Sequence, residues 1–242
     1  MFPSEREVAV HLDRHTKFFG SMTPADLVAR RAPTREDYFA RYKASVVPFT
    51  PTERTAIEAH VRAIDRACAR FSRFSALPWR FAKFVGADVE NDYPHTIGDI
   101  VFLPDDFFVA HTDAKQRETI LHEKVHVFQR RHTLETNILI LECWGYELHD
   151  LKSNYRLVRN NPDTNGIIYA RGGGAGACFQ RYNNEKPTDL GDSARTDACR
   201  DGGETHEHPY EKMAYAIADL VSNGTVRDDD GVRLIKWMCE YF

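Results

Sequence analysis

The stretch of sequence that decides the fold is TILHEKVHVFQ, residues 119–129. It contains the pattern His-Glu-x-x-His, with its histidines at His122 and His126. On an α-helix, residues four apart are separated by about 40° around the axis and about 6 Å along it, so both imidazoles can reach one metal ion. Glu123 is offset by about 100° from His122, so its carboxylate can stand beside such an ion and meet a water molecule there. The pattern therefore predicts a metal site on one face of a helix.

The residues around this pattern predict a helix with one buried edge. Leu121, Val125 and Phe128 form an apolar stripe next to the two histidines. Helical periodicity begins at residue 112 or 113 and continues to about residue 131.

The HEKVH motif on an amphipathic helix resembles the zincin metallopeptidases. The resemblance implies one zinc ion held by His122, His126 and a third protein ligand, with an open position for water. Zinc lowers the pKa of such a water toward about 7, and Glu123 is the expected general base that takes its proton and passes it to the leaving amine. We therefore expect zinc-dependent hydrolysis of peptide bonds in a peptide or protein substrate. The alternative is a zincin-derived metal-binding or structural protein without catalysis, which would have no need of Glu123.

His132 is one candidate for the third zinc ligand. It lies ten residues after His122, which is the spacing found in the metzincin branch of the family. That branch has a glycine where this chain has Gln129, and the glycine allows the helix to stop and turn. If the helix continues instead, His132 points about 240° around the axis from His126.

Two glutamate positions are the other candidates. Glu147 follows His126 by 21 residues on the next predicted helix, as in short-spaced gluzincins, and Glu142 is a weaker variant of the same idea. Glu211 lies in the first turn of a helix that Pro209 is expected to start. A glutamate followed by small residues on a second helix resembles the gluzincins with a distant glutamate ligand. We therefore favour Glu211 as the third ligand, with Glu147 and His132 as alternatives.

Residues close to Glu211 in sequence are candidates to complete the site. His206, His208 and Tyr215 could donate to the oxyanion of the transition state, and Tyr210 competes for the same role. The ordinary alternative is that the histidines are solvated loop residues and that the tyrosine belongs to the core. Related gluzincins have an aspartate near the position of Tyr215 that orients the first histidine, and Asp219 is a weak substitute for it.

Caps, prolines and apolar periodicity predict the other helices. Thr133 is the expected N-cap of the helix that follows the motif, and a capping box at residues 50–53 begins a long amphipathic helix. The predicted helices are two short ones that start at Thr23-Pro24 and Thr34, followed by 51–74, 133–149, 209–222 and 231–242.

Two aromatic and β-branched runs predict strands. One lies at residues 79–85 and the other at 97–103, joined by a polar connection. We expect them to form an antiparallel pair beside the motif helix, with a further strand at 166–171. By the resemblance to zincins, the 97–103 strand would bind extended substrate by edge pairing. The fold class is therefore α+β: a mainly helical zincin-like domain with a small mixed or antiparallel sheet packed beside the HExxH helix.

The expected organisation is a helical N-terminal extension at residues 1–50 and a zincin-like metallopeptidase domain at 51–242. Within the domain, residues 153–207 are rich in Gly, Asn, Asp and Pro and form a loop-rich insertion between two halves of the metal site. The Gly-rich run at 172–177 is expected to be a loop because 183–187 interrupts any helix that a dinucleotide site would need. Residues 228–230, three aspartates, are expected to be a solvated turn that caps the last helix.

Composition excludes several classes of partner. The net charge of -4 favours neither nucleic acid nor an anionic membrane surface as a partner, and no apolar run approaches the roughly 20 residues that span a bilayer. The five cysteines are an odd number without a CxxC pair, so we expect reduced thiols rather than a disulfide or a thiolate zinc site. Together with the charged N-terminal sequence, which does not resemble a secretory signal, this predicts an intracellular protein.

Overall fold

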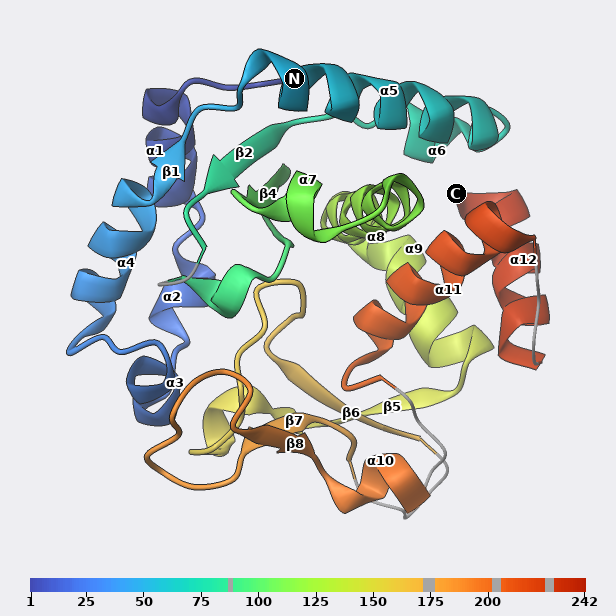
Figure 1. Ribbon diagram of the computed structural model, residues 1–242. Helices are drawn as coiled ribbons and strands as arrows, with labels where there is room; N and C mark the ends of the chain where they lie inside the picture. Colours follow the sequence, from blue (N-terminus) through green and yellow to red (C-terminus); the bar gives the residue numbers. More distant parts are fainter. Residues whose placement is uncertain (87–88, 172–176, 202–205, 225–228) are drawn as a thin grey trace.

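The computed structural model describes residues 1–86, 89–171, 177–201, 206–224 and 229–242. The fold is α+β, as expected, with helices around one four-stranded sheet and two smaller two-stranded sheets. Figure 1 shows helix α8 running through the middle of the molecule, between the four-stranded sheet and the C-terminal helices. The Gly-rich run at 172–176 lies outside the described residues.

Helices α1, α2 and α4 share a core with the four-stranded sheet, whereas the buried hydrophobic residues of α3 form a separate cluster with Tyr182 and Leu190. The bounds of α1 to α4 are Glu5–Arg14, Lys17–Gly20, Pro24–Ala29 and Arg35–Ala44. The predicted starts of α3 and α4 are confirmed, because the Thr23 and Thr34 side chains accept hydrogen bonds from backbone N–H groups of the first turn. Tyr42 of α4 packs with Phe84 and Phe102 of the sheet in this shared core.

The four-stranded sheet differs from the predicted antiparallel pair. Its strands are β1 (Val46–Val47), β2 (Phe81–Phe84), β3 (His95–Ile97) and β4 (Ile100–Pro104), in the order β1-β2-β4-β3. The strand predicted at 97–103 is present as β4, but it starts at Ile100, because Gly98, at a φ of 61°, turns the chain and makes β3 and β4 a hairpin. The prediction that the two hydrophobic runs pair antiparallel was wrong, since β2 and β4 are parallel. All residues of β2, β3 and β4 are buried, because helices cover the sheet.

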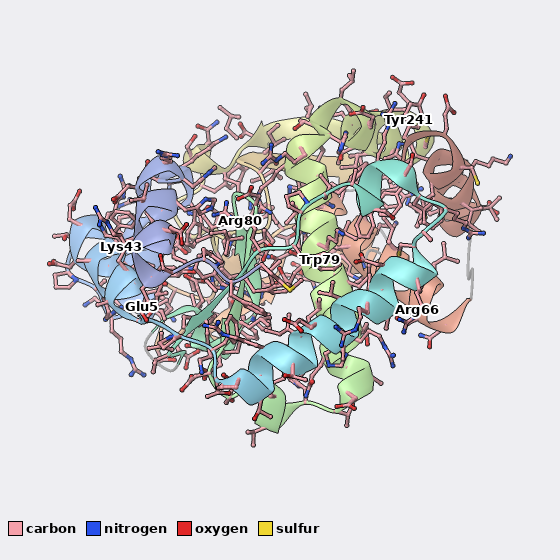
Figure 2. The ribbon with its side chains drawn as sticks, turned by 90° about the horizontal axis from the view of Figure 1, so that it is seen from above. Glu5, Lys43, Arg66, Trp79, Arg80 and Tyr241 are labelled. Carbon is pink, nitrogen blue, oxygen red and sulfur yellow. A yellow bond between two sulfur atoms is a disulfide. The ribbon has the colours of Figure 1, made fainter. Side chains whose placement is uncertain are left out.

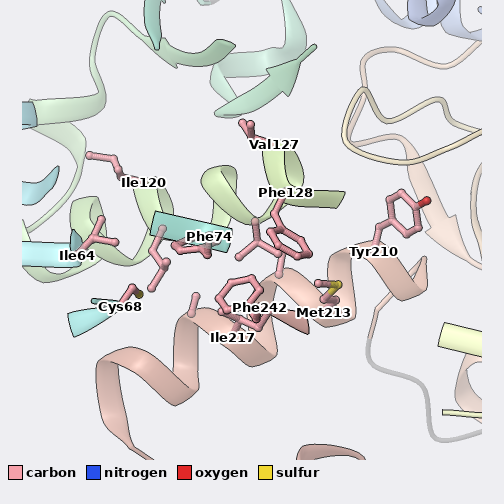
Figure 3. Close-up of a cluster of buried hydrophobic side chains, with 14 of the residues drawn as sticks. Ile64, Cys68, Phe74, Ile120, Val127, Phe128, Tyr210, Met213, Ile217 and Phe242 are labelled. Carbon is pink, nitrogen blue, oxygen red and sulfur yellow. The ribbon is translucent and has the colours of Figure 1, made fainter. Parts of the chain in front are cut away.

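Helices α5 to α8 form the layer that carries the motif. Their bounds are Pro51–Ala67, Ser72–Ser75, Phe107–Ala110 and Asp113–Arg131. The capping box of Thr50 and Glu53 and the extent of α8 are confirmed, whereas the helix predicted to reach residue 74 ends at Ala67. Seen from above, α5 lies across α8 (Figure 2). Phe74 of α6 and Phe128 of α8 pack with the C-terminal Phe242 in the main hydrophobic core (Figure 3).

The segment after α8 is only partly helical. Helix α9 (Thr133–Asn137) continues into a π-helix, η2 (Ile138–Cys143), and the chain then enters strand β5 (Tyr146–Leu151). The prediction of a helix to residue 149 was therefore wrong. Trp144 is buried and Gly145 has a φ of 70°, so the chain turns there out of the helical path. Thr133 is not the N-cap, which is His132 and makes no side-chain capping bond.

The predicted insertion contains more regular structure than expected. The predicted strand at 166–171 is confirmed as β6 (Ile167–Arg171), which pairs antiparallel with β5. Strands β7 (Gln180–Tyr182) and β8 (Ser193–Arg195) form a second hairpin, and the short helix α10 (Asp197–Asp201) follows. Two 3-10 turns, η1 (Glu90–Asp92) and η3 (Lys152–Asn154), complete the connections described before β6.

One pair of cysteines corrects the prediction of reduced thiols. Cys178 and Cys199 form a disulfide, with Cα atoms 4.6 Å apart. The two residues are 21 positions apart, and the β7–β8 hairpin brings them together, so sequence spacing alone did not indicate the pair. Cys68, Cys143 and Cys239 are free. None of the helices in the described part of the chain has the length and apolar character needed to cross a membrane.

Helices α11 (Pro209–Asn223) and α12 (Asp229–Tyr241) close the fold. Pro209 starts α11 and Gly224, at a φ of 67°, ends it, as predicted. The predicted turn at 228–230 is in part the start of α12, which includes Asp229 and Asp230, while Asp228 lies outside the described residues. The prediction that these aspartates are solvated was wrong for Asp230, which is buried and accepts hydrogen bonds from Arg171 and Lys212. This charged group ties α11 and α12 to strand β6.

Candidate metal centre

Three of the predicted ligands converge on one point. His122 and His126 lie one turn apart on α8, with their Nε2 atoms 3.0 Å from each other. Glu211 lies in the first turn of α11, and its Oε2 is 3.3 Å from His122 Nε2. Its Oε1 is 3.7 Å from His126 Nε2. Two imidazole nitrogens and a carboxylate in this arrangement match the ligand types of a three-coordinate protein site for zinc.

The packing of α11 against α8 positions Glu211. Helix α11 buries Met213, Ala214 and Ile217 in the same cluster as Val125 and Phe128 of α8. Figure 3 shows Met213 and Ile217 on the side of α11 that faces Phe128. Because Pro209 fixes the start of the helix, the buried face also places the first-turn glutamate against the two histidines.

Gln129 sets the protonation of His126. The Gln129 Nε2 group donates to the Tyr210 carbonyl at 2.9 Å, so its Oε1 faces His126 Nδ1 at 2.8 Å and must accept a hydrogen bond from an Nδ1–H group. His126 therefore carries its proton on Nδ1, and its Nε2 lone pair points at the site, as a metal ligand requires. Burial lowers the pKa of His126 to about 3, so the ring is neutral. His122 is held differently, since its buried Nδ1 has no hydrogen-bond partner among the described residues.

Glu211 is held in its ionised form. Burial alone would raise its pKa, but the facing His126 and His122 rings and the Asn161 amide outweigh this effect and lower it. Asn161 Nδ2 donates to Glu211 Oε1 at 2.9 Å and also to Glu207 Oε1 at 2.9 Å. A neutral His126 beside an ionised Glu211 is the protonation state in which these side chains bind a cation.

Glu123 lies beside the three ligands in a buried position. Its Oε2 accepts a hydrogen bond from the Thr96 hydroxyl at 2.8 Å, so strand β3 orients the carboxylate. Burial raises the pKa of Glu123 well above its ordinary value, and the nearby Asp163 and Glu211 carboxylates raise it further. Asp163 is also buried, and burial raises its pKa to about 6. Ligand-type atoms of Glu123, His126 and Asp163 all lie within 4.8 Å of one another.

The site opens into a cavity of about 670 Å³. Its lining includes His122, Glu123, Asp163, His206, Glu211 and Tyr215. Tyr215 is 45% exposed, and its ring centroid lies 4.4 Å from that of His122 and 5.0 Å from that of His206. Its partial burial, together with the nearby Glu211 and Glu123 carboxylates, raises the pKa of Tyr215 to about 12, so its hydroxyl keeps its proton at neutral pH. The cavity therefore leaves donor atoms of His122 and Glu211 open to solvent.

The structure keeps the alternative ligands away from the centre. His132 caps the end of α8 and stacks on Phe128, with ring centroids 4.4 Å apart. Glu147 is exposed on strand β5 rather than on a helix, and Glu142 is exposed on η2. The cluster that holds His122, His126 and Glu211 contains none of these three residues.

The histidine and tyrosine candidates separate into two groups. His206 and Tyr215 line the cavity, as their proposed roles require. His208 is neither at the cavity nor solvated: it is the buried N-cap of α11, where its Nδ1 accepts from the Tyr210 N–H at 3.1 Å. The Tyr210 ring belongs to the main core, and Asp219 lies two turns beyond Glu211, where it accepts from the Asn223 amide.

The edge of strand β3 is engaged within the chain. Thr96 donates its backbone N–H to Asp163 Oδ1 at 2.8 Å and accepts from Arg130 Nη2 at its carbonyl, also at 2.8 Å. The zincin resemblance implies that substrate pairs with the edge of this region. Thr96 has no free backbone group for such pairing.

Sequence reasoning missed four polar residues that shape the centre, namely Thr96, Gln129, Asn161 and Asp163. Asn161 and Asp163 flank a proline within the segment NNPD. This cluster of amide and carboxylate side chains is the only feature of the sequence that could have indicated a polar site there. Comparisons with protein-family models, with curated proteins and with solved structures found no match. The function must therefore be argued from the site itself.

Proposed function

We propose that this protein is a zinc-dependent peptidase in which His122, His126 and Glu211 bind the metal. The observation that carries the proposal is the convergence of these three side chains, with His122, Glu211 and the neighbouring Glu123 lining the cavity. Zinc, when bound, supplies a Lewis acid that activates water toward a carbonyl group. The protonation of His126 and Glu211 already suits cation binding, so little reorganisation of the ligands is needed.

The protein residues have distinct roles in this proposal. Thr96 holds Oε2 of Glu123, which leaves Oε1 to accept a proton from water and to deliver it to the leaving amine. The carboxylate of Glu123 would have a lower pKa beside a cation held by His122, His126 and Glu211, which would favour its basic form. Tyr215 keeps its proton and stands at the cavity surface, where it can donate to the oxygen that gains negative charge.

The test combines metal content with hydrolysis. Purified protein is loaded with zinc, dialysed, and analysed for bound metal by mass spectrometry. We expect one zinc per chain in the wild type and a loss of most of it in Glu211→Ala. Glu147→Ala and His132→Ala are the matched controls and should retain full zinc. Full retention of zinc affinity by Glu211→Ala would show that the ligand assignment is wrong.

A second variant separates metal binding from catalysis. Glu123→Gln should bind zinc like the wild type and lose peptide hydrolysis by at least about 100-fold, because general base catalysis contributes roughly that much or more. Peptide mixtures analysed by mass spectrometry provide the assay, since they do not presuppose a cleavage preference. Zinc binding without hydrolysis of any peptide by the wild type would favour the alternative, a zincin-derived protein that uses the metal for structure or interaction.

A further inference from the structure

One short segment separates the cavity lined by His122, Glu123 and Glu211, called the metal cavity below, from a second cavity. Residues 160–165, the wall segment, contribute Asn161, Pro162 and Asp163 to the lining of both cavities. The second cavity has a volume of about 860 Å³ and lies on the other side of this segment, toward α1 and the end of α8. The metal cavity is therefore closed on the side where a groove along β3 would continue.

The wall segment is fixed by buried hydrogen bonds. Asn160 donates its amide to the Asp26 carboxylate at 2.8 Å and accepts from Arg30 at its carbonyl at 3.0 Å. Arg30 is buried and pairs with Asp26 and with Glu90, at 2.9 and 2.7 Å. Arg130 donates to the Pro162 carbonyl at 2.8 Å. A segment held by several buried charge-assisted bonds is a permanent wall rather than a lid.

The wall also occupies the position at which an extended substrate would pair with the sheet. Asp163 Oδ1 takes the Thr96 N–H, while Arg130 takes the Thr96 carbonyl and lies 3.5 Å from the same Asp163 oxygen. A polypeptide that entered the metal cavity could not continue along β3 past this point. The cavity is therefore suited to one end of a chain, and not to its middle.

The charge at the closed side of the metal cavity indicates which end of a peptide would bind there. Asp163 projects a buried carboxylate to within 4.8 Å of ligand-type atoms of Glu123 and His126. Its hydrogen bond from the Thr96 N–H and its ion pair with Arg130, within the described part of the chain, both use Oδ1. In a peptide, the first amino nitrogen lies only about 2.5 Å from the carbonyl carbon of the first peptide bond. A terminal ammonium at Asp163 would thus place that bond next to Glu123 and the metal ligands.

We infer that this site removes single residues from the amino terminus of peptides and that Asp163 binds the α-ammonium group. This inference rests on the proposed peptidase function. Water adds across the first peptide bond, its hydroxyl goes to the carbonyl carbon, and Glu123 moves its proton to the leaving nitrogen. The products are one free amino acid and a peptide shortened by one residue. Asp163 touches the substrate and takes no part in the proton transfer.

The experiment compares two peptides that differ only at the amino terminus, one free and one acetylated. With the zinc-loaded wild type, we expect kcat/KM for cleavage after the first residue to be about 10- to 100-fold higher for the free peptide, as for loss of a charge-assisted bond. Asp163→Asn should abolish most of this preference while it retains zinc. Asp106→Asn, which removes another carboxylate of the same cavity, should keep the preference. Calorimetric titration of Glu123→Gln with both peptides gives the same comparison without turnover.

The outcomes distinguish this inference from the proposed function. Cleavage at interior bonds, or equal cleavage of the free and acetylated peptides, would overturn the amino-terminal assignment and leave the peptidase function intact. An unchanged preference in Asp163→Asn would overturn the role of Asp163. The absence of hydrolysis of any peptide by the zinc-loaded wild type would overturn both proposals. The peptide pair tests the wild type directly, so the result does not depend on the folding of a variant.

Discussion

Lys124, the residue between Glu123 and Val125, permits a quantitative test of the packing behind the motif. Its side chain is 1% exposed, and its Nζ has no hydrogen-bond partner within the described residues. The Nζ lies 3.7 Å from Asp65 and 3.8 Å from the centroid of the Trp79 ring. Burial lowers the pKa of Lys124 to about 8. The ammonium is therefore retained in the core at a cost in stability.

The cost can be compared with the attraction that offsets it. Lowering the pKa of a lysine from 10.5 to about 8 corresponds to about 3 kcal/mol of lost stability at neutral pH. The cation–π contact with Trp79 returns about 1–2 kcal/mol. Lys124→Met keeps the length of the side chain and removes the charge, so we expect the variant to be more stable by about 1–2 kcal/mol at pH 7. For a chain of this size, this raises Tm by about 2–4 °C.

The pH dependence of unfolding is a second check on the predicted stability difference between the wild type and Lys124→Met. Folded Lys124 releases its proton near pH 8, whereas the unfolded side chain keeps it to about 10.5, so the unfolded state binds more protons between these values. Wild-type stability should therefore rise relative to Lys124→Met over this window and stay parallel to it below pH 8. Urea unfolding of both proteins at pH 7 and pH 9.5 measures the effect. A variant less stable than the wild type at pH 7, or a difference independent of pH, would refute the reasoning.

Three further predictions concern other parts of the molecule. Arg30→Met should destabilise the fold by about 4 kcal/mol in urea unfolding, because it leaves two buried carboxylates without a cation, and a neutral result would contradict this. Gln129→Leu should weaken zinc affinity about 10- to 100-fold in a competition titration with a chelator, since His126 loses the acceptor that fixes its proton; unchanged affinity would count against it. Replacing Cys178 and Cys199 by serine should cost about 3 kcal/mol. Thiol titration of the unfolded, unreduced protein should find three free thiols, and five would exclude the disulfide.

The parts of the site that sequence predicts are those governed by local geometry. His122, Glu123 and His126 follow from helical spacing, and Pro209 fixes the turn that carries Glu211. Threonine caps give helix starts to within a residue for the same reason, since a cap bonds to a backbone group only a few positions away.

The parts that sequence does not predict depend on contacts between distant segments. Thr96 meets Glu123 only because β3 packs on α8, and Asp163 meets Thr96 across 67 positions of chain. The parallel pairing of β2 with β4 is likewise set by tertiary packing rather than by either hydrophobic run. The sequence comparison of Gln129 with the metzincin glycine considered only backbone conformation. In the structure, the side-chain amide of Gln129 contacts His126.

The contact between Thr96 and Asp163 has a consequence for the behaviour of the protein in solution. An open strand edge offers unpaired N–H and C=O groups to other chains and promotes self-association. Asp163 and Arg130 cover both groups of Thr96, and the opposite edge strand, β1, is only two residues long. The wall segment thus also protects the sheet from edge-to-edge aggregation. Substitutions in residues 160–165 that are made to test peptide cleavage should also change colloidal stability. Light scattering measures this second effect separately from the cleavage assay.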